Sequence, residues 1–189
     1  MTEKEGQLTF PFIEGEKIDL SAANLEHVNL YTKWKNNPEN RKFFVNPIPQ
    51  SVEEMKKSFE PKKQEVKEDI FFEIWHKNDS VPIGFIGFIR IGWYNRNALI
   101  FLMIGESKYW GQGIASEGVK LLVTYGFNEL NLHKISAEIL APDKASAWVL
   151  EKNNFKLEIR LEKEIFFEGK YVDKLSYAVF NRDWRGTNG

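Results

Sequence analysis

Apolar residues along this chain recur with two periods, one typical of helices and one typical of strands. From Ser21 to Trp34 they follow the three- and four-residue spacing of an amphipathic helix, which is predicted to end near Asn37-Pro38. A second helix is predicted at Ser51 to Glu54, because this Ser-Val-Glu-Glu segment has the form of a capping box. Residues 1–16 predict a loose N-terminal arm, which leads into a short first strand at Lys17 to Leu20.

The middle and the C-terminal part of the chain are rich in β-branched and aromatic residues, which favour strands. Two helices interrupt them, one beginning after Gly113 and one at Lys144 to Asn153. This order predicts an α/β fold with a mixed sheet and helices on both faces. The strands are expected at Ile70 to Trp75, Pro82 to Ile91, Ala98 to Gly105, His133 to Leu140, Leu157 to Leu161 and Lys170 to Phe180.

The length of 189 residues suits one medium-sized domain, which we expect at 17–184 with a C-terminal tail at 185–189. The hydrophobic share of 42% and the charged share of 28% are ordinary for a soluble globular protein. A net charge of −1 gives no electrostatic reason to expect binding to nucleic acid or to a membrane surface. No apolar run approaches the roughly 20 residues of a membrane span. The polar start of the chain argues against a targeting peptide, so we expect a cytoplasmic protein.

The chain contains no cysteine, which excludes disulfides, thiolate metal sites and a cysteine nucleophile. A covalent acyl-enzyme would then need a serine, and the Gly-x-Ser-x-Gly elbow is absent. His27, His76 and His133 are widely separated and show no metal-binding spacing. The sequence therefore predicts no metal.

One loop carries the strongest functional signal. A buried strand ends at Ile104, two glycines follow at Gly111 and Gly113, and a helix begins at once. Glycine allows positive φ and a close approach of the backbone to a ligand. The first N–H groups of a helix have no internal partner, and the helix dipole adds partial positive charge, so the loop predicts a site for a pyrophosphate. It is not a dinucleotide fingerprint, because Ser116 stands at the third glycine, nor a P-loop, because the Gly-Lys-Ser/Thr ending is missing.

The segment Tyr109 to Glu117, read YWGQGIASE, resembles the coenzyme-A signature of GNAT N-acetyltransferases, in the form of the RimJ/RimL and spermidine-acetyltransferase-like branch. The resemblance continues downstream and covers the chain from about Lys17 to Trp184. It implies the GNAT fold, with a twisted, mostly antiparallel sheet of six to seven strands. It also implies acetyl-CoA as co-substrate and direct attack by a primary amine in a ternary complex. The further matching motifs are Tyr31 to Pro38, Ser51 to Glu54, Tyr125 to Phe127, Leu130 to Lys134, Leu150 to Phe155 and Phe167 to Asp173.

The resemblance also implies which residues bind the coenzyme: the backbone before the signature, the signature itself and the start of the next helix. Asp143 stands where this branch has asparagine, and it could serve only as a helix N-cap. Ser146 keeps a hydroxyl that could bind the coenzyme or protonate the departing thiolate. The implied set is Leu102, Met103, Ile104, Trp110, Gly111, Gln112, Gly113, Ile114, Ala115, Asp143 and Ser146.

Two departures from the family pattern leave the catalytic groups open. Leu150 stands where many members have a tyrosine acid, and Ala98-Leu99 is apolar where an acid is often found. The candidate catalytic residues are Ser146, as the acid, and Glu73 and Glu106, as bases. Glu164 and a chain of solvent molecules are the alternatives, and for each acid a structural or surface charge is favoured over the role of base. The acceptor site is expected among aromatic residues outside the coenzyme motif: Trp34, Phe43, Phe44, Trp93 and Tyr94.

The sequence does not identify the acceptor, because related scaffolds acetylate protein N-termini, polyamines, amino sugars and antibiotics. We expect an amine partner, either a protein N-terminus of the ribosomal-protein type or a small amine, and a monomer or homodimer. A non-catalytic coenzyme-A-binding module of the same fold remains the alternative. Nucleic-acid binding is disfavoured, because acidic residues balance the basic ones along the chain.

Overall fold

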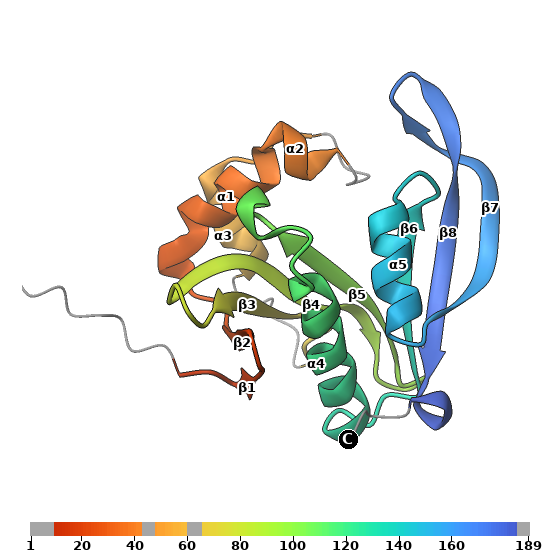
Figure 1. Cartoon of the computed structure of the whole chain (residues 1–189), viewed down its shortest axis with the longest axis horizontal. Helices are drawn as coiled ribbons and strands as arrows, with labels where there is room; N and C mark the ends of the chain where they lie inside the picture. Colours follow the sequence, from red (N-terminus) through yellow and green to blue (C-terminus); the bar gives the residue numbers. More distant parts are fainter. Residues whose placement is uncertain (1–9, 43–47, 60–65, 185–189) are drawn as a thin grey trace, which may run out of the picture.

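The computed structural model describes residues 10–42, 48–59 and 66–184 of the chain. Its centre is one eight-stranded sheet in the order β1-β2-β3-β4-β5-β6-β8-β7 (Figure 1). Neighbouring strands are antiparallel except β5 and β6, which are parallel. The strands are β1 (Ile13–Glu14), β2 (Ile18–Ala22), β3 (Ile70–His76), β4 (Val81–Gly92), β5 (Asn97–Ile104), β6 (Lys134–Leu140), β7 (Lys156–Phe167) and β8 (Lys170–Phe180). The predicted fold class is confirmed, with one strand more than expected.

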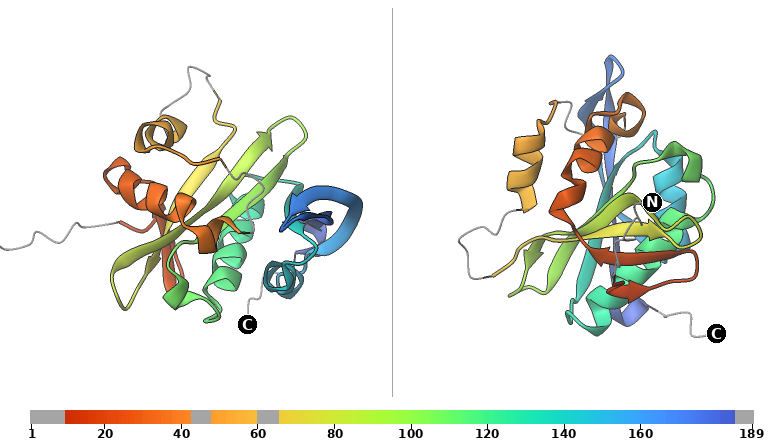
Figure 2. Two further views of the ribbon diagram at one scale, coloured as in Figure 1. Left: turned by 90° about the horizontal axis from the view of Figure 1, so that it is seen from above. Right: turned by 90° about the vertical axis from the view of Figure 1, so that its left-hand side faces the viewer.

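Helices cover both faces of the sheet (Figure 2). The alternation of side chains along β4 creates the two layers: Phe85 packs with Trp34 of α1, and its neighbour Ile86 packs on the other side in the core that includes Leu122 of α4. The helices are α1 (Val28–Asn36), α2 (Pro38–Arg41), α3 (Val52–Phe59), α4 (Ile114–Asn128) and α5 (Lys144–Lys152). Short 3-10 turns lie at η1 (Leu25–His27), η2 (Ser107–Tyr109) and η3 (Asn181–Asp183). Within the described ranges, no helix has both the length and the apolar character needed to cross a membrane.

The N-terminal region departs from the sequence prediction in two places. The chain stays extended through Ser21, which pairs with Glu73 in the ladder between β2 and β3, so α1 begins seven residues later than expected, at Val28. The Asn37-Pro38 pair ends α1 and also begins α2, which the pattern did not predict. The Asn37 side chain accepts the N–H of Glu39 at 2.9 Å as an N-cap, and proline suits the first helical position.

Candidate functional site

The predicted anion-binding loop connects β5 to α4. Gly111 and Gly113 have φ angles of +73° and +82°, and Gly113 is the N-cap of α4. The space around them is open. A Cβ at Gly111 would meet nothing within 4 Å, and one at Gly113 would meet only Lys17 Nζ at 3.8 Å. The first N–H groups of a 15-residue helix therefore face accessible space, as anion binding at a helix N-terminus requires.

Two side chains of the loop stabilise its shape. The Trp110 indole donates to the carbonyl oxygen of Ile104 at 2.9 Å, which ties the loop to the end of β5. The Gln112 carboxamide donates to the carbonyl oxygen of Lys108 at 2.7 Å. Since these polar groups are used inside the loop, the backbone N–H groups are the ones left for a ligand.

The strand that leads into this loop separates from its neighbour. β5 and β6 pair at only three positions, the last of which joins Leu99 to Ser136. Beyond Leu99, β5 continues with β4 alone, and β6 continues with β8 alone (Figure 1). The two edges that face each other, at 100–104 and 137–140, form no ladder. Their backbone groups can therefore bind an extended ligand that reaches the loop at Gly111.

The start of α5 lies beyond the β6 edge of this opening. Asp143 is the N-cap of α5, since its Oδ1 accepts the N–H of Ser146 at 3.0 Å. Ser146 is half-buried and lies one helical turn before Leu150, which is buried in the main core. The N-cap alternative for Asp143 is confirmed, and Leu150 has a packing role.

Glu73 belongs to a closed cluster on the other side of the sheet from α4. Its side chain is 1% exposed, and His27 Nδ1 lies 2.6 Å from its Oε1. The Tyr31 hydroxyl donates to the same oxygen, and the Trp75 indole donates to Oε2 at 2.7 Å. Burial raises the pKa of Tyr31, and the Glu73 carboxylate raises it further. A general base must reach the acceptor amine, and this buried carboxylate already accepts hydrogen bonds from its neighbours, which favours a structural role for Glu73 over that of the base.

Glu106 lies directly after β5, next to the loop. Its Oε1 accepts hydrogen bonds from the Trp34 indole at 2.8 Å and from Lys33 Nζ at 3.0 Å. The hydrogen bond from Trp34, reinforced by Lys33, holds the pKa of Glu106 below its ordinary value. A lowered pKa makes a carboxylate a weaker base, so Glu106 stays ionised and paired with Lys33 at neutral pH.

Asn40 is a residue of this region that sequence reasoning missed. It is buried, and its Nδ2 donates to the carbonyl oxygens of Trp34 at 3.1 Å and Gly105 at 2.9 Å. The contact fixes α2 against the end of β5 and joins residues 65 positions apart, so no local spacing could indicate it. Among the described residues, nothing pairs with its Oδ1.

The described aromatic residues that were predicted for the acceptor site do not come together. Trp34 is fully buried beside Glu106. Trp93 and Tyr94 lie in the turn between β4 and β5, at the opposite end of β5, about 25 Å away for a strand of eight residues. Tyr94 is 98% exposed there. Phe43 and Phe44 fall outside the described residues.

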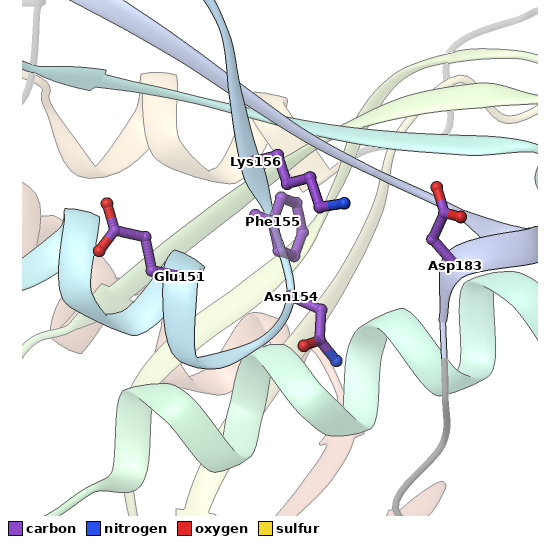
Figure 3. A pocket seen from close by; sticks show the side chains of 5 residues that line it. All are labelled: Glu151, Asn154, Phe155, Lys156 and Asp183. Atoms are coloured by element: carbon purple, nitrogen blue, oxygen red, sulfur yellow. The ribbon is translucent and has the colours of Figure 1, made fainter.

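A pocket of about 320 Å³ lies elsewhere, at the C-terminal end of α5. Figure 3 shows side chains from α5, from the start of β7 and from η3 around it. Asp143 and Ser146 lie at the other end of α5, so this pocket is separate from the loop and the strand opening. Its lining residues are Glu151, Asn154, Phe155, Lys156 and Asp183.

Known proteins share both the sequence pattern and the fold. The profile described as "Acetyltransferase (GNAT) domain" matches residues 17–156. The "Uncharacterized N-acetyltransferase p20" of Bacillus licheniformis is 28% identical over 174 residues, which cover 90% of this chain and 97% of that protein. The spermidine N(1)-acetyltransferase of Escherichia coli (strain K12) is 27% identical over 106 residues, or 56% of each chain. A solved spermidine N-acetyltransferase from Vibrio cholerae, in complex with CoA and spermine, superimposes with a TM-score of 0.81. That superposition covers 89% of this chain and 98% of the other at 21% identity, which shows a common fold.

Proposed function

Since the chain belongs to the acetyltransferase (GNAT) family, we propose that it moves an acetyl group from acetyl-CoA to a small primary amine. One observation carries the proposal. The unpaired edge of β5 runs straight into the loop where the N–H groups of α4 are uncovered. An extended coenzyme can therefore place its pyrophosphate on the loop at Gly111–Ala115 and its pantetheine arm along Leu102–Ile104.

The reaction is a direct attack. The neutral amine adds to the thioester carbonyl, the new C–N bond forms, the C–S bond breaks and the thiolate leaves. Backbone N–H groups of the open β5 edge are suited to stabilise the oxyanion that develops on the carbonyl. Ser146 is our candidate for the proton that the thiolate takes up, because its hydroxyl lies at the start of α5, next to the opening. A chain without cysteine offers no thiol for an acyl-enzyme.

A cationic amine is the acceptor that we favour. A free alkylamine has a pKa near about 10, so it arrives mostly as an ammonium ion. Glu106, whose pKa is lowered, remains ionised, and an arriving ammonium ion would share its carboxylate with Lys33 at the end of β5. The spermidine acetyltransferase among the relatives supports a polyamine-like acceptor. The proton of the ammonium then leaves to solvent, since the Glu73 carboxylate is buried among its hydrogen-bond partners and the lowered pKa of Glu106 makes it a weak base.

Release of the coenzyme thiol from acetyl-CoA in the presence of an amine tests this function. Spermidine and shorter diamines should release thiol, whereas peptides with free N-termini should release less. The Glu106→Gln variant should raise KM for the amine and leave acetyl-CoA affinity unchanged. Binding of acetyl-CoA without thiol release from any amine would overturn catalysis and leave a coenzyme-binding module. Equal or greater rates with peptides would assign a protein N-terminus as the acceptor.

A further inference from the structure

A lysine from the N-terminal hairpin reaches the anion-binding loop. Lys17, in the connection between β1 and β2, places its Nζ 3.0 Å from the carbonyl oxygen of Gln112. The same nitrogen lies 3.8 Å from the position that a Cβ on Gly113 would take. The two partners of this hydrogen bond are 95 residues apart in the chain, and Lys17 lies outside the glycine motif.

The helix that carries the loop also holds this lysine in place. Glu117, in the first turn of α4, turns back to the hairpin, and its Oε1 accepts the N–H groups of Glu16 at 2.7 Å, Lys17 at 2.9 Å and Ile18 at 3.4 Å. The approach is so close that a Cβ at Gly15 would lie 2.6 Å from that oxygen. The backbone of Lys17 is therefore fixed to the first turn of the helix whose N-terminus it faces.

The ammonium group of Lys17 adds to the positive potential at the start of α4. The N-terminus of α4 already carries partial positive charge, and Lys17 adds a full positive charge beside it. Lys17 is exposed, and none of the described carboxylates forms an ion pair with it. One of its three N–H donors is used by Gln112, so two remain. An anion between the lysine and the helix end would satisfy both.

We propose that Lys17 binds the pyrophosphate of coenzyme A, and that Glu117 positions it. The inference rests on the proposed function, since it names a further residue of the same coenzyme site. It also accounts for the glutamate that ends the YWGQGIASE segment, because that side chain couples the hairpin to the loop.

Calorimetric titration with coenzyme A, 3′-dephospho-coenzyme A and pantetheine tests the proposal. Lys17→Met should weaken coenzyme A and the dephospho form alike, by about tenfold, because a charge-assisted hydrogen bond to the pyrophosphate is lost. Pantetheine, which has no phosphate, should bind wild type and variant equally, and Lys17→Arg should keep most of the affinity. Lys120→Met is the matched control, since it removes the same charge from an exposed site about 10 Å along α4.

Glu117→Ala tests the positioning role. It should reproduce the pattern of Lys17→Met across the three ligands, and adding Lys17→Met to it should cost little more. Coenzyme A affinity of Lys17→Met within twofold of wild type overturns the inference, as does an equal loss for pantetheine or for Lys120→Met. A loss with coenzyme A only, not with the dephospho form, would move the contact to the 3′-phosphate and overturn the pyrophosphate assignment. A wild type that binds none of the three ligands would instead overturn the proposed function, and this inference with it.

Discussion

Two polar regions of this protein use their hydrogen-bonding groups in opposite ways. Around Glu73 the charged and polar groups lie inside the protein and pair with one another. The Glu73 carboxylate contacts the side chains of His27, Tyr31 and Trp75. At the start of α4 the first N–H groups have no partner among the described residues, and a Cβ at Gly111 would meet none of them within 4 Å. The first region is complete without a ligand and stabilises the fold. We propose that an anion completes the second, in which case exposed unpaired donors, rather than an acid, mark the site.

The largest expected effect comes from breaking the closed region. Glu73→Ala removes the carboxylate that His27, Tyr31 and Trp75 contact in a buried to half-buried cluster, so the free energy of unfolding should fall by about 3 kcal/mol or more. Urea unfolding measures this loss, with the exposed Glu164→Ala as a control that should change little. Acetyl-CoA affinity of the folded variant should be unchanged. A stable Glu73→Ala protein that has lost kcat would contradict the structural role and return Glu73 to the reaction.

On the open side, Ser146→Ala should lower kcat by about a hundredfold, the low end of general acid catalysis. A thiolate is a tolerable leaving group, with a thiol pKa near about 8.5, so the acid should contribute only modestly. The N-cap survives the change, because Asp143 accepts the backbone N–H of Ser146 and not its hydroxyl. Steady-state kinetics with the best amine, together with an acetyl-CoA titration, separates the rate effect from binding. Full kcat in Ser146→Ala would make this serine an ordinary helix residue.

A bulky residue in the loop should weaken coenzyme binding by at least about tenfold, or about 1.4 kcal/mol. Gly113→Val places a branched side chain at φ +82°, where valine is strained and where the anion is expected. Gly169→Val is the matched control, because Gly169 has φ +81° and equally open surroundings in the turn between β7 and β8. Both variants should lose similar stability, but only Gly113→Val should lose acetyl-CoA. Equal affinities in the two would show that the loop does not bind the coenzyme.

The smallest expected effect concerns Glu106. Its carboxylate is paired, like the groups around Glu73, but partly exposed, like the loop at the start of α4. Its folded pKa is below the ordinary 4.5, so its contribution to stability is complete above that value and is lost as the pH falls through the lower folded pKa. Glu106→Gln should therefore cost less than about 1 kcal/mol at neutral pH, given the solvent screening. Urea unfolding of both proteins at neutral and acidic pH should show the difference shrinking with acid. A difference that grows with acid would reverse the sign of the pKa shift.

Local patterns in the sequence predicted what local forces determine. The capping box at Ser51 forms as expected, with Glu54 N–H donating to Ser51 Oγ at 3.2 Å, and both glycines of the loop adopt positive φ. The strand predicted at Leu157 to Leu161 extends in the structure to Phe167. The sequence did not indicate the longer strand, because this edge strand is exposed for almost its whole length and shows little apolar alternation. Local patterns carry no such information about partners brought together by the topology.

The features that the sequence could not predict depend on contacts between segments far apart in the chain. Glu73 alternates with apolar residues on a central strand, which fits a base and a buried structural group equally well. Its surroundings depend on distant residues such as His27, which lies 46 positions away in the chain. The same limit hid Asn40, whose partner Gly105 lies 65 positions along the chain. Residues that the fold brings together over such separations have no characteristic spacing in the sequence by which they could be recognised.

The short parallel contact between β5 and β6 has a consequence for the cooperativity of the molecule. It divides the sheet into two antiparallel blocks, β1 to β5 and β6 to β8, each built from one continuous stretch of chain and joined at only three residue positions. Amide protons at this junction should exchange with solvent sooner than those between β3 and β4. A ligand lying along both open edges would contact both blocks, so its binding free energy would add to the free energy needed to separate them. If the coenzyme binds there, the enzyme should be more resistant to unfolding when the ligand is bound than when it is free.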